Sequence, residues 1–269
     1  MNIAIFCAFD TPATIEFAKA AIAYLENKGH HLTLDQRLTA HLPQKAKAYD
    51  AFDAHATIDS KNDYLFSIGG DGTLLRSITF VKNTEIPILG INTGRLGFLT
   101  SLQKESLNEA LDKFFTKKYK LIKRSLLAVE LSTPSAEIEK FGYALNEISI
   151  NRKNTTAMLS IATQIDKQYL TTYWADGLII STPTGSTGYS LSSGGPILTP
   201  ETKGIVLNPI APHNLNIRPL VVPDKAEIEI SVDGRGEDHL LSLDSRIFTI
   251  ENGTKIHIKK APFSVFTVE

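Results

Sequence analysis

Short apolar runs alternate with amphipathic stretches along the first hundred residues. The runs with the length and bounding residues typical of buried strands are at residues 2–9, 31–35, 64–68 and 86–92. Residues 12–28 predict a helix that begins at a proline and ends before Gly29, and residues 73–82 predict a helix with one apolar face. This alternation predicts a parallel sheet whose ligand crevice lies at the carboxyl ends of the strands.

After a predicted helix at residues 105–118, the pattern changes to short β-type runs separated by turn residues. These runs are at residues 126–131, 143–150, 158–165, 177–181 and 226–232. Residues 248–251 and 254–258 flank Asn252-Gly253, a dipeptide typical of tight hairpins, and therefore predict a β-hairpin. The second part of the chain is thus expected to be mostly β.

The chain has 269 residues, which is long enough for two domains. The change of rhythm places their border near residue 100, between an α/β domain (residues 1–100) and a β-rich domain (residues 101–254). With 28 basic and 29 acidic residues the formal net charge is −1, which predicts no general attraction to nucleic acid or to an anionic membrane. The basic stretch at residues 113–124 is interpreted as a solvated helix end.

The cysteine content and the first residues bear on the cellular compartment. Cys7 is the single cysteine and lies in an apolar run, so we expect a buried strand residue, no intramolecular disulfide and no zinc cluster of several cysteines. The first ten residues lack the basic stretch of a secretory signal, and no 18 apolar residues follow one another. These features predict a cytoplasmic protein without a membrane-spanning helix.

The stretch SIGGDGTLL, residues 67–75, turns from a predicted strand through glycines into a predicted helix. Glycines let the backbone approach a ligand closely and leave Asp71 as the only side chain in the turn before Thr73. Neither G-x-G-x-x-G after the first strand nor G-x-x-x-x-G-K-[ST] occurs in the chain. Two interpretations of Asp71 stay open on this evidence: an N-cap of the following helix, or an acid presented to a ligand.

A second glycine-rich turn follows the predicted strand at residues 177–181. The stretch DGLIISTPTGSTGYSLSSGGP, residues 176–196, combines glycines with many hydroxyl side chains, which can bond both phosphates and base edges. Tyr189 could stack on an aromatic ring or could pack in the protein. We interpret this turn as part of a ligand site.

These residues together resemble the NAD kinase family, which phosphorylates the 2′-hydroxyl of the adenosine ribose of NAD to give NADP. The matching stretches, in chain order, are GGDGT at residues 69–73, LGINTGRLGFLT at residues 89–100, Asn146-Glu147, the stretch at residues 176–196, and AP and RPLV within residues 211–221. GGDGT also resembles turns of diacylglycerol kinases and phosphofructokinases, whereas the long second motif is specific.

The resemblance implies an N-terminal α/β domain with a Rossmann-like parallel sheet and a C-terminal β-rich domain of β-sandwich type. It places the active site between the domains. It also implies that the C-terminal tail, about residues 255–269, returns to the first domain. Assembly into a homo-oligomer, a dimer or a tetramer, is implied as well.

The resemblance assigns Asp71 as the catalytic proton acceptor. Asn146 and Glu147 would bond hydroxyls of NAD, Asp176 would reach its nicotinamide end, and residues 187–192 would hold adenosine. The full set of expected NAD-binding positions is Gly69, Gly70, Gly72, Thr73, Arg76, Asn146, Glu147, Asp176, Thr187, Gly188, Tyr189, Ser190, Leu191, Ser192, Ala211 and Arg246.

The chain departs from the family pattern at a few positions. Trp174 stands where many members have a basic residue, two positions before the aspartate of DGL. Asp244 is followed by Ser245 and Arg246 where members often have Gly-Gln, and Gly188 stands where an alanine is familiar.

In the expected chemistry Asp71 acts on NAD, which accepts the phosphoryl group, and not on ATP, which donates it. The carboxylate would take the proton of the ribose hydroxyl as its oxygen attacks the γ-phosphorus of ATP. Mg²⁺ or another divalent metal would ride on the ATP phosphates, and no protein metal ligand is expected. The alternatives are a noncatalytic NAD(P)-binding sensor, which would not need Asp71, and a lipid or sugar kinase that shares GGDGT.

Overall fold

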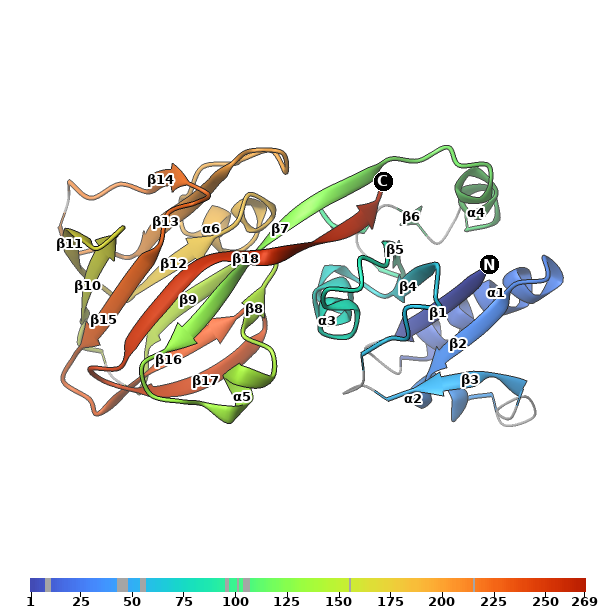
Figure 1. The fold of residues 1–269 in the computed structure, drawn as a ribbon, viewed down its shortest axis with the longest axis horizontal. Coiled ribbons are helices and arrows are strands. Elements are labelled where there is room, and N and C mark those ends of the chain that lie inside the picture. Colours follow the sequence, from blue (N-terminus) through green and yellow to red (C-terminus); the bar gives the residue numbers. More distant parts are fainter. Residues whose placement is uncertain are drawn as a thin grey trace. The chain divides into compact units, whose positions relative to one another are not determined.

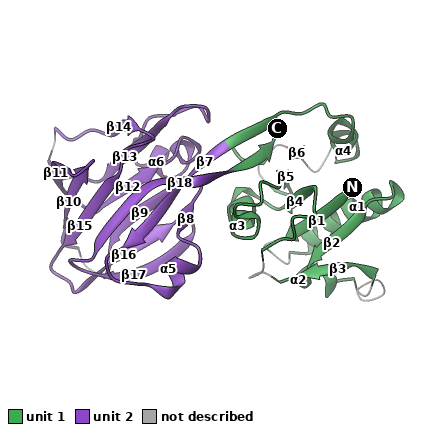
Figure 2. Ribbon diagram, viewed as in Figure 1, with its two compact units in different colours: residues 1–123, 265–269 green, residues 124–264 purple. Residues whose placement is uncertain are grey.

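The computed structural model describes residues 1–7, 11–42, 48–53, 57–94, 97–100, 102–103, 107–154, 156–214 and 216–269. Phe9, Arg95, Leu96 and Glu105, which belong to elements or motifs expected from the sequence, lie outside these ranges. The chain forms two compact units (Figure 2). Unit 1 comprises Met1–Lys123 and Val265–Glu269, and unit 2 comprises Arg124–Ser264.

Unit 1 alternates strands and helices, as the apolar pattern predicts (Figure 1). Its strands are β1 (Asn2–Cys7), β2 (His31–Asp35), β3 (Asp50–Phe52), β4 (Tyr64–Ile68), β5 (Ile88–Asn92) and the short β6 (Leu102–Gln103). Its helices are α1 (Pro12–Asn27), α2 (Gln36–Thr39), α3 (Asp71–Val81) and α4 (Leu107–Phe115).

The strands of unit 1 form a parallel sheet in the order β3-β2-β1-β4-β5, and the end of β18 (Lys255–Val268) pairs in parallel with β5. The order reverses between β1 and β4, where Ile5 lies beside Phe66. Open parallel sheets bind ligands outside the carboxyl ends of their strands at such a switch point. The prediction of a Rossmann-like parallel sheet is confirmed, and the sheet directs attention to the segment that follows β4.

Helices cover both faces of this sheet because successive strand residues point to opposite sides. Ile3 and Ile5 of β1 lie in a core with apolar residues of α1 and α4. Phe6, which points to the other face, packs on Phe80 of α3 with 4.5 Å between the ring centroids. The carboxyl edge of the sheet therefore remains for other contacts.

Unit 1 extends further along the chain than the change of sequence rhythm suggests. The border falls after Lys123 instead of near residue 100, because Leu107, Leu111 and Phe114 of α4 belong to the core of unit 1. Only Val265–Glu269 of the C-terminal strand lie in unit 1. Helix α4 packs against the sheet of unit 1, so this unit continues past its last helix, and the sequence has no linker at the border.

Unit 2 consists mainly of two sheets. The first has the order β11-β10-β15-β18, with β7 beside β18 and β8 beside β7, and the second has the order β14-β13-β12-β9-β16-β17. The elements are β7 (Leu121–Leu131, which begins in unit 1), α5 (Ala136–Lys140), β8 (Tyr143–Ala144), β9 (Glu147–Arg152), β10 (Leu159–Ile165), β11 (Gln168–Ala175), β12 (Gly177–Ser181), α6 (Tyr189–Ser192), β13 (Gly204–Ile210), β14 (Leu220–Pro223), β15 (Ile228–Asp233), β16 (Asp238–Leu243) and β17 (Arg246–Glu251).

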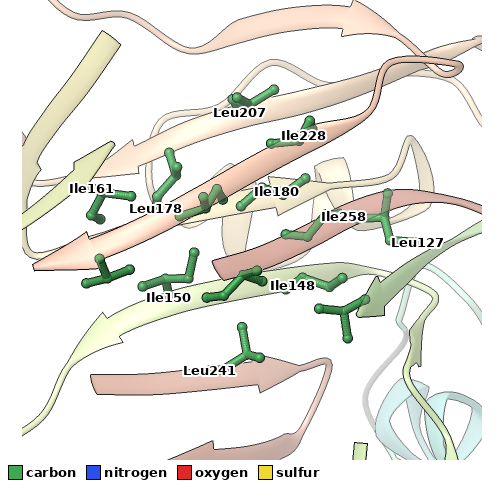
Figure 3. Packing of buried hydrophobic residues seen from close by; sticks show 14 of the residues in the cluster. Leu127, Ile148, Ile150, Ile161, Leu178, Ile180, Leu207, Ile228, Leu241 and Ile258 are labelled. Carbon is green, nitrogen blue, oxygen red and sulfur yellow. The ribbon is translucent and has the colours of Figure 1, made fainter. Parts of the chain in front are cut away.

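The two sheets of unit 2 share one apolar core. Ile148 of β9 and Leu178 of β12 come from one sheet, and Ile161 of β10 and Ile258 of β18 come from the other (Figure 3). All four side chains are almost completely buried. The prediction of a β-rich, sandwich-like second part is confirmed.

The hairpin predicted at Asn252-Gly253 is wrong. β17 pairs with β16, whereas β18 pairs with β15, so the turn connects strands of different sheets. Gly253 has φ +82, the left-handed conformation that the dipeptide favours. Ile250 before the turn and Ile256 after it lie in the same core. Turn residues determine the local reversal of the chain, but the packing of the sheets determines which strands pair.

Within the described ranges, no helix combines the length and the apolar composition that crossing a bilayer requires.

Candidate functional site

The first glycine turn connects β4 to α3 in unit 1. A Cβ atom on Gly69 would lie 2.1 Å from Oγ1 of Thr73, so this position accepts only glycine without rearrangement. Gly70 is the N-cap of α3 and provides no side-chain cap, and Asp71 is the first residue of the helix. The turn places Asp71 directly after β4, at the switch point of the sheet.

The carboxylate of Asp71 does not cap its own helix. Its Oδ2 atom accepts the backbone N–H of Phe98 at 2.8 Å. Its Oδ1 atom accepts the N–H groups of Leu99 at 3.1 Å and Thr100 at 3.2 Å, and also the Thr100 hydroxyl at 3.2 Å. The capping interpretation is therefore wrong, and the carboxylate is oriented by the segment at residues 97–100.

Buried polar groups support this orientation. The Thr100 hydroxyl accepts a hydrogen bond from Nδ2 of Asn92 at 3.0 Å, and Oδ1 of Asn92 accepts the N–H of Gly94 at 2.7 Å. Asn92 and Thr100 are both buried. A Cβ atom on Gly97 would lie 2.2 Å from Oδ1 of Asp71, so only glycine leaves room for the carboxylate.

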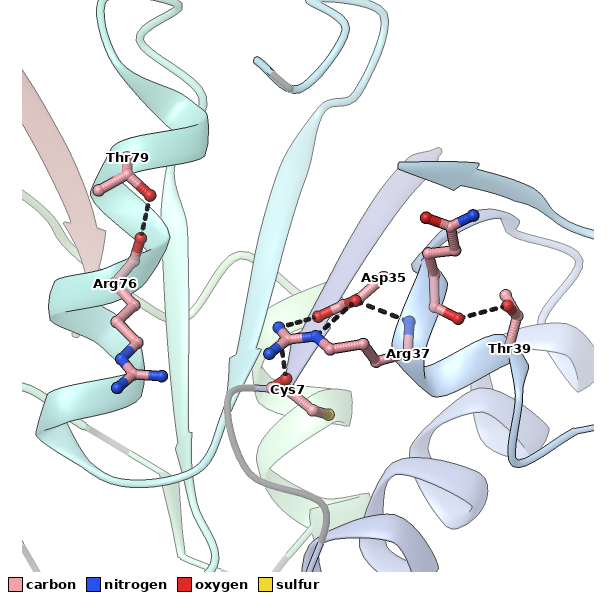
Figure 4. A network of polar contacts seen from close by, with 7 residues as sticks. Cys7, Asp35, Arg37, Thr39, Arg76 and Thr79 are labelled. Carbon is pink, nitrogen blue, oxygen red and sulfur yellow. Dashed lines mark hydrogen bonds and ion pairs between the residues drawn. The ribbon is translucent and has the colours of Figure 1, made fainter. Parts of the chain in front are cut away.

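Two arginines lie near the carboxyl edge of the unit 1 sheet (Figure 4). Arg37 donates to the buried carboxylate of Asp35 and to the carbonyl of Cys7, at the ends of β2 and β1. An acid at the end of the second strand usually bonds a ribose in dinucleotide folds, and here it is engaged in an ion pair. Arg76 lies on the exposed side of α3, and its carbonyl accepts the hydroxyl of Thr79.

In unit 2 the structure brings Asn146 and Glu147 against the second glycine turn. A Cβ atom on Gly185 would lie 2.1 Å from the carbonyl oxygen of Asn146. A Cβ atom on Gly188 would lie 3.2 Å from Oε2 of Glu147 and 3.4 Å from Nδ2 of Asn146. The backbone of Tyr189 bonds the Glu147 carboxyl. Two motifs separated by about forty residues in the sequence thus form one surface.

This surface contains polar atoms that lack a partner. Oδ1 of Asn146 and Oε2 of Glu147 are buried, and neither has a hydrogen-bond partner among the described residues. Burial, followed by the negative charge of Asp244, raises the pKa of Glu147 to about 8. Buried polar atoms are normally satisfied, so these two atoms indicate a place where ligand hydroxyls can bind.

Asp176 and Ala211 lie at the opposite end of β12. The N–H of Asp176 donates to the carbonyl of Ile210 at 3.0 Å, immediately before Ala211. Arg152 approaches the Asp176 carboxylate at 2.7 Å. Asp176 lies five positions before Ser181, which pairs with Glu147, so roughly 17 Å of strand separate the two ends, a distance that suits an extended ligand.

The positive charge near Asp176 comes from the end of β9 and not from the position that the family pattern marks. Trp174, at the position where the family pattern has a basic residue, is exposed on the edge strand β11. Arg152 of β9 provides the charge instead. Nothing in the sequence around Arg152, a basic residue at the end of a β-type run, indicates that it pairs with Asp176.

The expected adenosine segment contains both exposed and buried residues. Thr187 and Gly188 are half-buried, and Tyr189, Leu191 and Ser192 are exposed. Ser190 is fully buried, and its carbonyl accepts Nδ2 of Asn208 at 2.8 Å. Ser190 therefore anchors the short helix α6, while its neighbours are accessible.

Arg246 is used within unit 2. Its guanidinium donates to the carbonyls of Phe141 and Tyr143 and lies 5.0 Å from the centroid of the Phe141 ring. Burial lowers its pKa, and the charge of Asp244 opposes this shift. These bonds hold the chain that leads to Asn146 and Glu147.

The described residues include no group of three or more His, Cys, Asp or Glu side chains arranged to hold a metal ion.

The fold and the two glycine turns define a class of protein: a Rossmann-like unit with an acid at its switch point, followed by a β-sandwich whose glycine turn is rich in hydroxyl side chains. Residues 3–119 match the family described as the ATP-NAD kinase N-terminal domain, and residues 145–269 match the ATP-NAD kinase C-terminal domain. The chain belongs to the NAD kinase family.

Relatives and solved structures agree with this assignment. The chain is 47% identical to the NAD kinase of Flavobacterium psychrophilum, over all of this chain and 92% of the relative. It is 54% identical to the NAD kinase of Christiangramia forsetii, over 83% of this chain and 76% of the relative.

Two solved structures cover the whole chain. An NAD kinase from Archaeoglobus fulgidus in complex with ATP has a TM-score of 0.78 and 25% identity, with 94% of that chain covered. The yeast NADH kinase complexed with NADH has a TM-score of 0.86 and 24% identity, with 83% of that chain covered, and supports the fold.

Proposed function

We propose that this protein is an NAD kinase that transfers the γ-phosphoryl group of ATP to the 2′-hydroxyl of the adenosine ribose of NAD. The observation that carries the proposal is the position of Asp71, an oriented carboxylate at the switch point of the unit 1 sheet. Family membership and the hydroxyl-rich surface of unit 2 support the same reaction.

Asp71 acts as the general base through its Oδ2 atom. A carboxylate has about four lone-pair sites over its two oxygens. Among the described residues, Oδ1 accepts three hydrogen bonds and Oδ2 accepts one, from Phe98. The remaining lone pair of Oδ2 accepts the proton of the ribose hydroxyl while the hydroxyl oxygen attacks the γ-phosphorus of ATP.

Unit 2 binds the dinucleotide along β12. The unpartnered oxygens of Asn146 and Glu147 accept sugar hydroxyls, and Asp176 with Ala211 receives the nicotinamide end. A Glu147 carboxyl with a pKa of about 8 is mostly neutral at pH 7, so it can donate as well as accept a hydrogen bond. The exposed ring of Tyr189 is available to stack on adenine.

The further positions proposed to bind NAD belong to unit 1. Gly69, Gly70, Gly72 and Thr73 form the turn that brings the backbone close to NAD, and Arg76 contributes a positive charge from the exposed side of α3. Mg²⁺ or another divalent metal, bound with ATP, would neutralise phosphate charge, and no described side-chain cluster of this protein would be needed to hold it.

Two alternatives make different predictions. A noncatalytic NAD(P) sensor would bind the dinucleotide but would not need an oriented acid at the switch point. A lipid or sugar kinase would share GGDGT but would not need the second motif, which here forms one surface with Asn146 and Glu147. The family and both motifs favour the NAD kinase reaction.

The test is to incubate the purified protein with NAD, ATP and Mg²⁺ and to measure NADP with an NADP-specific dehydrogenase. We expect NADP to accumulate, and parallel reactions with NADH and with inorganic polyphosphate define the acceptor and the donor. NAD binding without product from any donor would support the sensor, and absence of NAD binding would overturn the proposal.

We further propose that the enzyme works as a cytoplasmic homo-oligomer, a dimer or a tetramer, as the family resemblance implies. Light scattering after size exclusion measures the assembly, and a monomeric mass at assay concentration would contradict it.

A further inference from the structure

Asp244 lies in the two-residue turn between β16 and β17, where Leu243 pairs with Arg246. Its backbone φ angle is +52, a conformation that residues other than glycine adopt infrequently. Aspartate is one of the residues that two-residue turns favour at this position, so the turn accounts for the backbone conformation but not for the contacts of the carboxylate.

The carboxylate of Asp244 binds the main chain that carries Asn146 and Glu147. It accepts the N–H groups of Leu145 at 2.9 Å, Asn146 at 2.7 Å and Glu147 at 3.2 Å. The N–H of Asp244 in turn donates to the carbonyl of Glu147 at 3.0 Å. One residue therefore makes four hydrogen bonds to three consecutive residues almost a hundred positions earlier in the chain.

Thr182 donates hydrogen bonds to the carbonyl groups of the same segment. The Thr182 hydroxyl donates to the carbonyl of Leu145 at 2.6 Å, and its N–H donates to the carbonyl of Asn146 at 2.9 Å. The main chain is thus held on both sides, whereas the Asn146 and Glu147 side chains each present a buried oxygen without a partner among the described residues. The direction of these oxygens follows from the restrained backbone.

We propose that Asp244 is a positioning residue for dinucleotide binding: its carboxylate restrains residues 145–147 so that Asn146 and Glu147 meet the sugar hydroxyls of the ligand. This inference rests on the proposed function. Asp244 itself does not touch the ligand, and its effect passes through the two side chains that do.

The variant Asp244→Asn tests the proposal because it keeps the size of the side chain. An amide presents an N–H₂ group in place of one carboxylate oxygen, so at least one of the three N–H donors loses its acceptor. The matched control is Asp166→Asn. Asp166 also lies in a tight turn, between β10 and β11, has φ +50, and accepts one backbone N–H, that of Glu227 at 2.9 Å.

We expect Asp244→Asn to raise the dissociation constant and the KM for NAD about tenfold or more, because small displacements of positioning groups have effects of this size. The KM for ATP and kcat should change much less, and Asp166→Asn should leave all of these constants near the wild-type values. Equal NAD affinity in the two variants would overturn the proposal.

A double-mutant cycle separates positioning from general destabilisation. In the background Asn146→Ala/Glu147→Ala, the Asp244→Asn change should have little further effect on NAD affinity, since the side chains that it positions are absent. The same tenfold loss in that background would overturn the proposal. Calorimetric titration with NAD gives these affinities without turnover, so a wild-type protein that fails to bind NAD would identify a failure of the proposed function instead.

Discussion

The backbone nitrogen of Phe98 lies 2.8 Å from Oδ2 of Asp71, across 27 positions of sequence. The neighbouring N–H groups of Leu99 and Thr100 point to Oδ1 of the same carboxylate. Because the peptide groups bond both oxygens, the carboxylate has one orientation. Among the described residues Oδ2 accepts one hydrogen bond, which leaves a lone pair for the proton transfer of the proposed reaction.

Replacing Asp71 with asparagine should remove the base but keep the fold. The amide oxygen can still accept the N–H groups of Leu99 and Thr100, whereas the N–H of Phe98 then faces the amide N–H₂ group and loses its acceptor. NAD affinity should therefore stay near the wild-type value, and the melting temperature should fall only slightly. We expect kcat to fall by about 10²–10⁴-fold, the usual contribution of a general base. Steady-state kinetics and calorimetric titration with NAD measure both quantities.

The control for this change is Asp59→Asn in the same unit, where the carboxylate accepts the N–H of Lys61 in an exposed turn. This variant should keep full activity. Near-normal turnover of Asp71→Asn would show that the carboxylate has only a structural role.

Gly185→Ala should damage the unit 2 surface. The new Cβ atom would meet the carbonyl of Asn146 at 2.1 Å, and both segments are main chain that cannot move aside cheaply. Overpacking of this kind costs about 1–3 kcal/mol. We expect a lower free energy of unfolding in urea and a higher KM for NAD.

Gly236→Ala is the matched control, because its nearest contact would be an ordinary 3.5 Å to the carbonyl of Asp238. If both glycine variants behave alike, the close approach of Gly185 to Asn146 has no functional weight.

Glu147→Gln should change how stability depends on pH. The pKa of Glu147 is about 8 in the folded protein, against a model-peptide value of 4.5, so between these values the native state holds a proton that the unfolded chain releases. Folding stability contributed by this group therefore falls as pH rises through the window, by at most about 1.4 kcal/mol for each pKa unit. Glutamine removes this loss.

The measurement is urea unfolding at about pH 5 and about pH 8.5, which lie near the limits of the window. Relative to wild type, Glu147→Gln should gain stability at the higher pH. Glu251→Gln, at an exposed position of β17, should show no such gain. A constant difference between Glu147→Gln and wild type at both pH values would contradict the expected titration.

Removal of divalent metal should stop phosphoryl transfer without affecting the folded protein. The proposed Mg²⁺ binds ATP phosphates and keeps several waters, as is usual for this ion. A chelator should abolish NADP formation, added Mg²⁺ should restore it, and the melting temperature without nucleotide should not change. A chelator-induced fall in melting temperature would instead indicate a metal bound by the protein itself.

The sequence by itself determined the types of most elements and the places of both glycine turns. Its apolar periodicities mark β1, α1, β2, β4, α3 and β5 to within a few residues, because alternation and helical spacing are local properties of a chain that buries one face. The glycines of GGDGT and of the turn near Gly185 are also visible in the sequence. They stand where the main chain approaches other atoms too closely for a Cβ atom.

Only the tertiary structure decided which distant groups meet. In the folded chain Asp71 accepts hydrogen bonds from residues 98–100 and does not cap its helix, and Arg246 donates to the carbonyls of residues 141 and 143. The carboxylate of Asp244 accepts the N–H groups of Asn146 and Glu147. The strands on either side of Asn252-Gly253 belong to different sheets. These contacts depend on strand order and on the packing of two sheets over one core, which residue spacing along a single chain does not encode.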